Sequence, residues 1–267
     1  MKTIDRALTP MLIEAALEQR IYRDDTHDVR MHDVIRLFLD AGMRVFITGG
    51  APREWLIDRQ GKDIDLSLDR PIEDAQRLLR NAYPDIDMVR MRNDRFGMMR
   101  WGGVDSGCVD INILRSWKDI QGDDMWSTSF ISRKDLVDDA LMRDFSVNAF
   151  YYDCRERSLL DPLGCGMADL QAKKLRLIAH RRVLETSFRA TFRILQFFCR
   201  GYSATANVLE HLERYADRDI QGMGARIHQW IPGNFSAGSE SLEEFRHLLY
   251  THARQQASID TLDSFFN

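Results

Sequence analysis

Two glycines followed by two aspartates are the residues of this chain whose types and spacing could do chemistry. Gly49 and Gly50 follow the apolar run 45–47 after a single threonine, and Pro52 stands where a helix would begin. Paired glycines ahead of a helix let backbone N–H groups come close to an anion, and the helix start adds positive potential. The pattern predicts a phosphate-binding turn, and the alternative is an ordinary tight turn.

The aspartates Asp63 and Asp65 flank Ile64 at the start of a predicted strand, 63–68. Successive side chains of a strand point to opposite faces, so Ile64 and Leu66 should face the core and both aspartates the other side. Two carboxylates on one face repel each other unless a cation lies between them. We therefore predict a divalent-metal site here, and the alternative is a solvated strand edge.

A further acidic residue, Asp110, lies in a second predicted strand, 108–115. The alternation of side chains places Val109 and Ile111 on one face of this strand and Asp110 with Asn112 on the other. The residues alone leave open whether Asp110 is a solvated surface aspartate or part of a site.

Charged residues also recur at two places further along the chain. Arg143 and Asp144 are adjacent in the segment 135–150, and the residues alone favour a structural ion pair between them. From residue 183 the pattern becomes helical, with Arg189 and Arg193 on a face opposite to an apolar one. These two arginines either contact a ligand or belong to a solvated helix face.

Composition limits the classes of function. The chain has 267 residues, of which 44% are hydrophobic, and a formal net charge of −4. This charge argues against a globally basic nucleic-acid binder but allows a local basic patch. The apolar runs are too short to cross a membrane, and the N-terminal residues lack the core of a signal peptide, so we expect a cytoplasmic protein. The four cysteines are scattered and are expected to be reduced, and the histidines lack zinc-ligand spacing.

Taken together, Gly-Gly-x-x-Arg at 49–53, a short apolar helix and Lys-Asp-Ile-Asp-Leu at 62–66 resemble a known signature. It is that of the class II tRNA nucleotidyltransferase (CCA-adding enzyme)/poly(A) polymerase family, in the polymerase beta-like nucleotidyltransferase superfamily. The segment 135–150 is similar to a second motif of this family, although Met142 replaces the first of its two arginines. The resemblance covers about residues 45–195.

The resemblance implies an α/β (α+β) nucleotidyltransferase head with a small mixed β-sheet, followed by an all-helical neck. The implied domains are residues 1–180, with N-terminal helices ahead of the head, and 181–267, without the body and tail regions of the family. A homodimer or a partner protein is one way in which the missing body could be replaced.

The resemblance also implies roles for particular residues. Catalysis and the binding of two Mg²⁺ ions fall to Asp63, Asp65 and Asp110. The NTP, as ATP and/or CTP, is contacted by Gly49, Gly50, Arg53, Arg143, Asp144, Asn148, Arg189 and Arg193. The expected reaction joins a nucleoside monophosphate to an RNA 3′ end, with tRNA as a candidate, and releases pyrophosphate.

One departure from the family concerns the choice of base. Where the family has Glu-Asp-x-x-Arg before Ile-Leu-Arg, an alignment on Ile194-Leu195 places Arg189 and Ala190 at the acidic pair and keeps Arg193. An arginine and an alanine lack the carboxylate acceptor with which the family reads the base, so the sequence leaves the selected nucleotide open. It also leaves open two other functions, namely transfer to a protein hydroxyl or a nucleotide, and a catalytically silent nucleotide- or RNA-binding module.

Overall fold

The computed structural model describes residues 2–4, 10–61, 63–85, 89–103, 107–121, 128–235 and 238–266. Backbone contacts divide the chain into two compact units, Met1–Met167 and Ala168–Asn267. The boundary predicted at 180/181 falls inside the second unit, and the assignment of head and neck domains to these ranges stays a prediction. In the described parts of the chain, no helix is both long enough and apolar enough to cross a bilayer.

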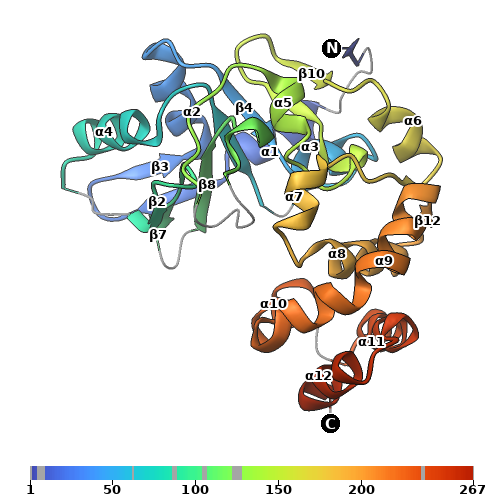
Figure 1. Cartoon of the computed structure of the whole chain (residues 1–267). Coiled ribbons are helices and arrows are strands. Elements are labelled where there is room, and N and C mark those ends of the chain that lie inside the picture. Colours follow the sequence, from blue (N-terminus) through green and yellow to red (C-terminus); the bar gives the residue numbers. More distant parts are fainter. Residues whose placement is uncertain are drawn as a thin grey trace. The chain divides into compact units, whose positions relative to one another are not determined.

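A mixed β-sheet forms the centre of the first unit (Figure 1). Strands β5 and β8 are parallel, whereas the other neighbouring strands of the sheet run antiparallel. In spatial order, the strands are β1 (Lys2–Thr3), β10 (Ser158–Asp161), β9 (Tyr151–Asp153), β4 (Val45–Thr48), β5 (Asp65–Leu68), β8 (Gly107–Ile113), β7 (Met98–Gly103) and β6 (Val89–Asn93). The prediction of a mixed sheet is therefore confirmed.

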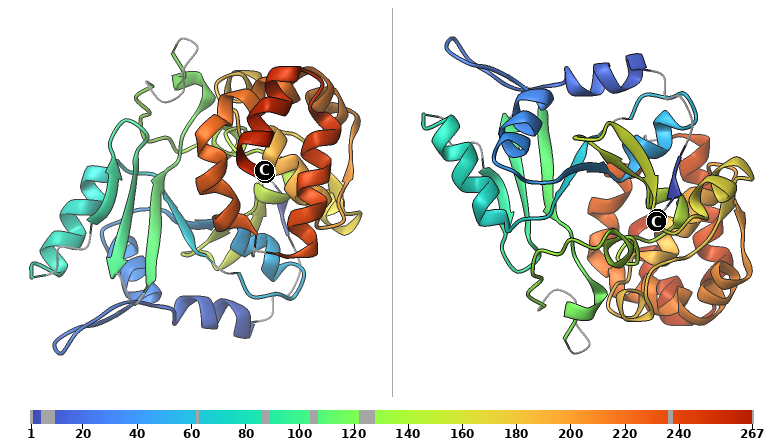
Figure 2. Two further views of the ribbon diagram at one scale, coloured as in Figure 1. Left: turned by 90° about the horizontal axis from the view of Figure 1, so that it is seen from below. Right: turned by 90° about the horizontal axis from the view of Figure 1, so that it is seen from above.

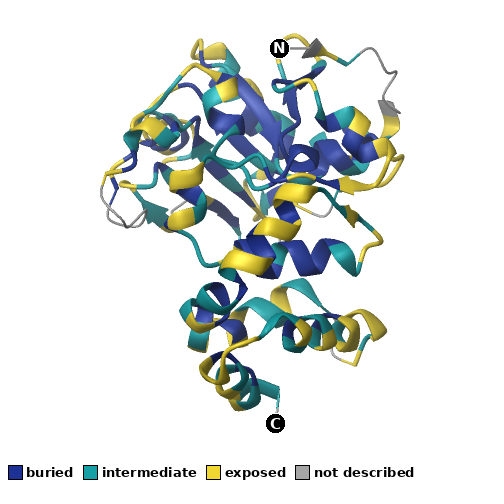
Figure 3. Cartoon of the chain, turned by 45° about the vertical axis from the view of Figure 1, so that its right-hand side comes forward, coloured by how far each residue is buried: buried dark blue, intermediate teal, exposed yellow. Residues whose placement is uncertain are grey.

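One face of this sheet is covered by helices α2 (Met31–Asp40) and α4 (Ile72–Ala82), which contact each other and strands β4 and β8 (Figure 2). Leu66, Leu68, Ile111 and Ile113 are almost completely buried, and their alternate positions place them on a single face of β5 and β8. Strands β4 and β5 at the centre of the sheet consist mainly of buried residues, and dark blue strands are visible there in Figure 3. The apolar residues thus leave the opposite face of β5 and β8 to polar side chains.

The remaining elements of the first unit connect or flank the sheet. A hairpin of β2 (Arg20–Arg23) and β3 (Asp28–Arg30) contacts β7 and β8 through β2. Helix α3 (Gly50–Trp55) follows β4 directly and spans only six residues. The other elements are α1 (Pro10–Leu17), η1 (Trp117–Asp119), α5 (Leu136–Ala140) and η3 (Ser146–Asn148), while α6 (Gly166–Gln171) continues from this unit into the second.

In its described residues, the second unit is built from helices apart from one short strand pair, β11 (Lys174–Leu175) with β12 (Ser203–Ala204). The prediction of a helical C-terminal region is confirmed, although β12 interrupts the all-helical pattern. Phe192, Trp230 and Phe245 form an aromatic cluster inside this unit. The helices are α7 (Arg181–Glu185), α8 (Ala190–Phe198), α9 (Ala206–Met223), η4 (Gly224–Arg226), α10 (Ile227–Asn234), α11 (Glu240–His252) and α12 (Gln256–Phe266).

Candidate active site

Asp65 and Asp110 lie side by side on the polar face of the sheet. Strands β5 and β8 are neighbours and parallel, and their register pairs Asp65 directly with Asp110. Their side chains share a face because Leu66 and Ile111, the next residues along each strand, point into the core. The pairing of two strands about forty residues apart thus brings together two of the three predicted carboxylates.

This juxtaposition changes the acid–base properties of Asp65. Burial, together with the negative charge of Asp110, raises the pKa of the Asp65 carboxyl to about 6. The charge of Asp63 acts in the same direction, whereas Arg143 and Arg100 oppose it. A carboxyl with a raised pKa beside a second carboxyl is typical of a site that binds a cation or transfers a proton.

Arg100 on β7 lies against the other side of Asp110. Its Nε and Nη2 atoms each donate to one carboxylate oxygen of Asp110, both at 2.6 Å. The register of β7 and β8 places the two residues directly opposite each other. Asp110 is therefore already partly neutralised, and a metal ion would compete with this guanidinium for the same oxygens.

Asp63 lies outside the strand on which it was predicted. Strand β5 begins at Asp65, and Asp63 is an exposed residue ahead of it, while Lys62 of the sequence motif falls outside the described residues. The alternation argument therefore holds for Asp65 but stops before Asp63. Within the described residues, no group of three or more acidic, histidine or cysteine side chains is arranged to hold a metal ion. The set Asp63, Asp65 and Asp110 stays a prediction.

Gly49 packs against the carboxylate of Asp65. A Cβ atom added at Gly49 would lie 2.5 Å from Oδ2 of Asp65, and Gly49 has a φ of +77°, which disfavours other residues. Thr48, the preceding residue, pairs with Asp65 across β4 and β5. The glycine turn and the carboxylate pair therefore form one continuous surface.

Three of the predicted nucleotide-binding residues are joined by hydrogen bonds. The buried guanidinium of Arg53 on α3 donates through Nη1 to Oδ1 of Asn148. Asn148 in turn donates from Nδ2 to Oδ1 of Asp144 at 2.8 Å. Arg53 also donates through Nη2 to Glu54 at 2.6 Å. This chain of contacts links the turn after β4 to the second sequence motif.

Arg143 forms a different ion pair from the one that the residues suggested. Its Nη2 donates to Oδ2 of Asp139 at 2.9 Å, so the expected pairing with Asp144 is wrong. Residues four apart lie one turn apart on a helix, and this spacing brings Arg143 to Asp139. Arg143 also donates to Oγ of Ser67 at 3.2 Å, which lies two residues beyond Asp65.

Asp139 is a residue that the sequence reasoning did not single out. It is fully buried, and it accepts from Arg143, from the hydroxyl of Tyr151 at 2.6 Å and from the backbone N–H of Arg115 at 2.8 Å. Burial opposes ionisation of Asp139, but Arg143 and Arg115 outweigh it and lower the pKa of this carboxyl. Asp139 thus holds Arg143 beside the polar face of β5. Its position four residues before Arg143 is the sequence feature that could have identified Asp139.

The two remaining predicted residues, Arg189 and Arg193, belong to the second unit. Arg189 directly precedes α8, and Arg193 lies one turn further along this helix. Burial lowers the pKa of Arg189, and the positive charges of Arg226 and Arg193 lower it further. Arg189 therefore lies in a locally positive environment.

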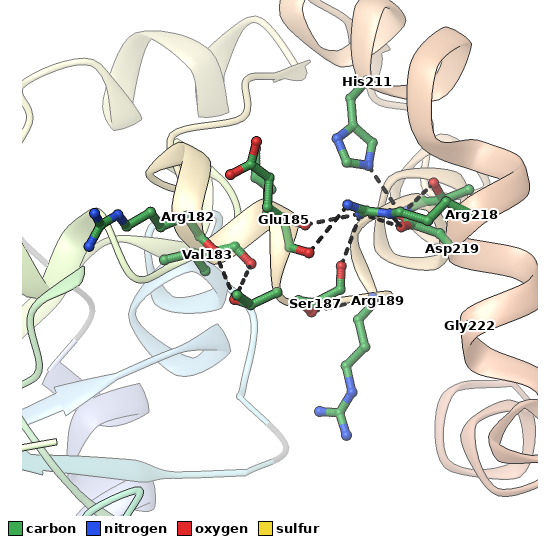
Figure 4. Close-up of polar contacts among 12 residues, drawn as sticks. Arg182, Val183, Glu185, Ser187, Arg189, His211, Arg218, Asp219 and Gly222 are labelled. Carbon is green, nitrogen blue, oxygen red and sulfur yellow. Dashed lines mark hydrogen bonds and ion pairs between the residues drawn. The ribbon is translucent and has the colours of Figure 1, made fainter. Parts of the chain in front are cut away.

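A network of buried polar contacts fixes the turn that carries Arg189 (Figure 4). Asp219 on α9 accepts from the backbone N–H of Thr191 at 3.0 Å and from its hydroxyl at 2.8 Å. Arg218 donates to Asp219 at 2.6 Å and to the carbonyl of Leu184 at 3.0 Å. In Figure 4 the side chain of Arg189 points away from this network. The contacts with α9 thus hold the turn between α7 and α8, and the side chain of Arg189 extends from this turn on the side away from them.

Comparison with known proteins agrees with this arrangement. Residues 45–176 match the family described as the poly A polymerase head domain. A poly(A) polymerase I of Salmonella typhi is 27% identical over 154 residues, which are 56% of this chain and 31% of that protein. The chain thus spans about a third of the length of this curated relative.

Two solved structures show a similar fold. The crystal structure of the Bacillus stearothermophilus CCA-adding enzyme in complex with CTP has a TM-score of 0.62 at 16% identity and covers 84% of this chain and 52% of its own. A tRNA nucleotidyltransferase complexed with a primer tRNA and an incoming ATP analog has a TM-score of 0.54 at 16% identity, with 87% and 59% covered. At these identities the similarity shows the fold alone.

The mixed sheet, followed by a helical region, has the head-and-neck fold of template-independent nucleotidyltransferases. The match to the head domain begins at the first residue of β4 and includes both strands that carry the opposed aspartates. The chain belongs to the tRNA nucleotidyltransferase/poly(A) polymerase family.

Proposed function

We propose that this chain transfers a nucleoside monophosphate from an NTP to the 3′ hydroxyl of an RNA and releases pyrophosphate. The observation that carries the proposal is the pairing of Asp65 with Asp110 on neighbouring strands, with Gly49 against one of the carboxylates. The relative named poly(A) polymerase I and the structures titled as complexes with CTP and with a primer tRNA support ATP or CTP as substrate and RNA as acceptor.

A divalent cation suits the chemistry of this carboxylate pair. Carboxylate oxygens are the ligands that Mg²⁺ prefers, and the raised pKa of Asp65 reflects burial of the group and the neighbouring charge of Asp110. We propose that Asp65 and Asp110 hold Mg²⁺, with Asp63 as the third ligand of the predicted two-ion site. When bound, Mg²⁺ would lower the pKa of the attacking hydroxyl and neutralise charge on the triphosphate.

The residues of the chain would supply the positioning. The 3′ oxygen of the RNA attacks the α-phosphorus, the bond to the bridging oxygen breaks, and the hydroxyl proton leaves toward the carboxylates of Asp65 and Asp110. Gly49 and Gly50 would bring backbone N–H groups close to the phosphates. Arg143, held by Asp139, places a fixed positive charge near Asp65, so catalysis would depend mainly on orientation and charge neutralisation.

The second unit would contribute to nucleotide binding through its arginines. Arg189 and Arg193 are proposed to face the base or the phosphates of the NTP, as predicted from the sequence. Their mutual repulsion with Arg226 would be relieved by a negatively charged ligand. The cytoplasmic location and the association with a second copy or a partner protein stay predictions.

The decisive experiment incubates the purified chain with each α-labelled NTP, Mg²⁺ and RNA. We expect label in RNA, and we expect its loss in Asp65→Asn and Asp110→Asn while Asp74→Asn remains active. Asp74 is the matched control because it is a helix aspartate that pairs with the exposed Arg77. Label in protein would show a polypeptide acceptor, and NTP binding without transfer would show a silent module, so either result would contradict the proposal.

A further inference from the structure

Arg115 lies beside the proposed active site, and among the described residues its side chain forms no ion pair with a carboxylate. Other cations nearby each have a carboxylate: Lys118 pairs with Asp138 at 2.9 Å, Arg143 with Asp139 at 2.9 Å, and Arg133 with Asp119. Among the described residues, the guanidinium of Arg115 forms no ion pair, and its Nε is buried without a hydrogen-bond partner. Its backbone N–H, not its side chain, contacts Asp139.

Stacking does not replace the missing counter-ion. The guanidinium carbon of Arg115 lies 4.5 Å from the ring centroid of Phe96 and 5.8 Å from that of Phe130. Cation–π contacts of this kind are weaker than the cost of removing an ion from water. Consistent with this, burial lowers the pKa of Arg115 to about 10, although Asp139 acts against the shift. Asp139 thus acts on Arg115 through its charge, but the half-buried guanidinium keeps a buried Nε without a hydrogen-bond partner.

The backbone of Arg115 lies beside the end of β5, and its N–H donates to Asp139, which holds Arg143 beside the polar face. The preceding residue, Leu114, donates its backbone N–H to the carbonyl of Leu68 at 2.8 Å, at the end of β5. Gly49 contacts Asp65 at the other end of the same strand. At a rise of about 3.3 Å per residue, the two ends of β5 lie roughly 10 Å apart. Arg115 is therefore a second candidate position for binding an anion, separate from the glycine turn.

We propose that the guanidinium of Arg115 binds a phosphate group of a substrate at the end of the β5–β8 face opposite to the glycine turn. A guanidinium is well suited to phosphate because its planar N–H groups donate to two oxygens at once. Arg143, joined to Arg115 through Asp139, adds a second positive charge at this end. The phosphate could come from the polyphosphate of the NTP or from the backbone of the acceptor RNA. This assignment of a substrate rests on the proposed function.

The test uses Arg115→Met, which keeps an unbranched side chain over Phe96 but removes the charge. Inorganic pyrophosphate is titrated in metal-free buffer and followed by thermal unfolding and calorimetry. If the phosphate comes from the NTP, Arg115→Met weakens pyrophosphate binding about tenfold or more, Arg115→Lys weakens it less, and the surface control Arg77→Met leaves it unchanged.

A second arm measures the binding of a single-stranded RNA at several salt concentrations. If the phosphate belongs to RNA, Arg115→Met reduces the slope of log affinity against log salt by about 0.7. A change in either arm supports the proposal, whereas unchanged affinity for both pyrophosphate and RNA overturns it. The free protein gives a third readout: an unpaired buried cation predicts that Arg115→Met melts no lower than the wild type, and a purely structural arginine predicts a lower melting temperature.

Binding of pyrophosphate or RNA does not require catalysis, so this inference and the proposed function can fail separately. A chain that labels no RNA, yet loses affinity when Arg115 is replaced, would contradict the proposed reaction and retain the phosphate site. A chain that labels RNA with unchanged binding in Arg115→Met would retain the reaction and remove the site.

Discussion

Replacing Gly49 by alanine should disturb the geometry of the carboxylate pair. Its effect on nucleotidyl transfer can be distinguished from its effect on the stability of the fold. The added Cβ would lie 2.5 Å from Oδ2 of Asp65, whereas ordinary contacts begin at 3.4 Å. The carboxylate or the turn must therefore shift by the difference, 0.9 Å. A misplacement of about 1 Å at reacting groups can cost roughly 100-fold in rate. We expect Gly49→Ala to lose nucleotidyl transfer by about this factor.

The backbone makes a second, separable contribution. Gly49 has a φ of +77° and a ψ of −133°, a conformation that L-residues rarely adopt, and a backbone held in such a sparsely populated region costs about 1–3 kcal/mol. Gly42 provides a matched control, because its φ is also +77° and an added Cβ would meet nothing within 4 Å. Gly42→Ala should therefore lose a similar amount of stability, about 2–4 °C per kcal/mol in melting temperature, while its turnover stays close to that of the wild type.

The assay compares single-turnover incorporation of labelled NTP into RNA for both variants, well below their melting temperatures. The informative quantity is the ratio of the two rates, because both variants place an L-residue at a φ of +77° and only Gly49→Ala adds a contact with Asp65. Equal rates in Gly49→Ala and Gly42→Ala would refute the reasoning, since the contact between the turn and Asp65 would then have no catalytic consequence.

Three further predictions follow from contacts of single residues. In cation-free buffer, stability should fall as pH rises from 3.8 to about 6, because the folded state holds the proton of Asp65 more tightly than the unfolded chain does; melting curves at stepped pH should show the fall, and Asp65→Asn should flatten it. Arg100→Gln should lower the Mg²⁺ concentration for half-maximal transfer several-fold, since Arg100 competes for Asp110; a Mg²⁺ titration with an unchanged midpoint would contradict this. Asp219→Asn should destabilise the chain by about 3–5 kcal/mol in denaturant unfolding, because it leaves the charge of Arg218 without its partner, whereas Asp260→Asn, on an exposed helix face, should have little effect.

Side-chain alternation explains how much of the site could be predicted from the sequence. It placed Asp65 and Asp110 on the faces opposite to Leu66 and Ile111, and the pairing of β5 with β8 then brings them together. The same argument failed for Asp63, because β5 begins two residues later than predicted. Alternation constrains only residues inside a strand, and strand ends are set by pairing that the local sequence does not show.

The partners of the charged residues were harder to predict. Arg100 meets Asp110 only because β7 and β8 pair in one register, which a local pattern cannot reveal. Arg143 was assigned to its neighbour Asp144, although helical spacing favours Asp139, four residues earlier. Contacts within one turn can thus be read from spacing, whereas contacts across strands require the topology.

The charges around β5 and β8 imply that nucleotide and cation must bind together. On the polar face, Arg100 pairs with Asp110 and Asp139 pairs with Arg143, while burial and the charge of Asp110 raise the pKa of Asp65. A triphosphate would bring several negative charges to a surface that already holds excess negative charge at this end. Only added positive charge near Asp65 can make that approach favourable, and the unmatched Arg115 lies at the other end of the strand. A nucleotide should therefore bind weakly without Mg²⁺, and its affinity should rise with the metal concentration until the carboxylates are saturated.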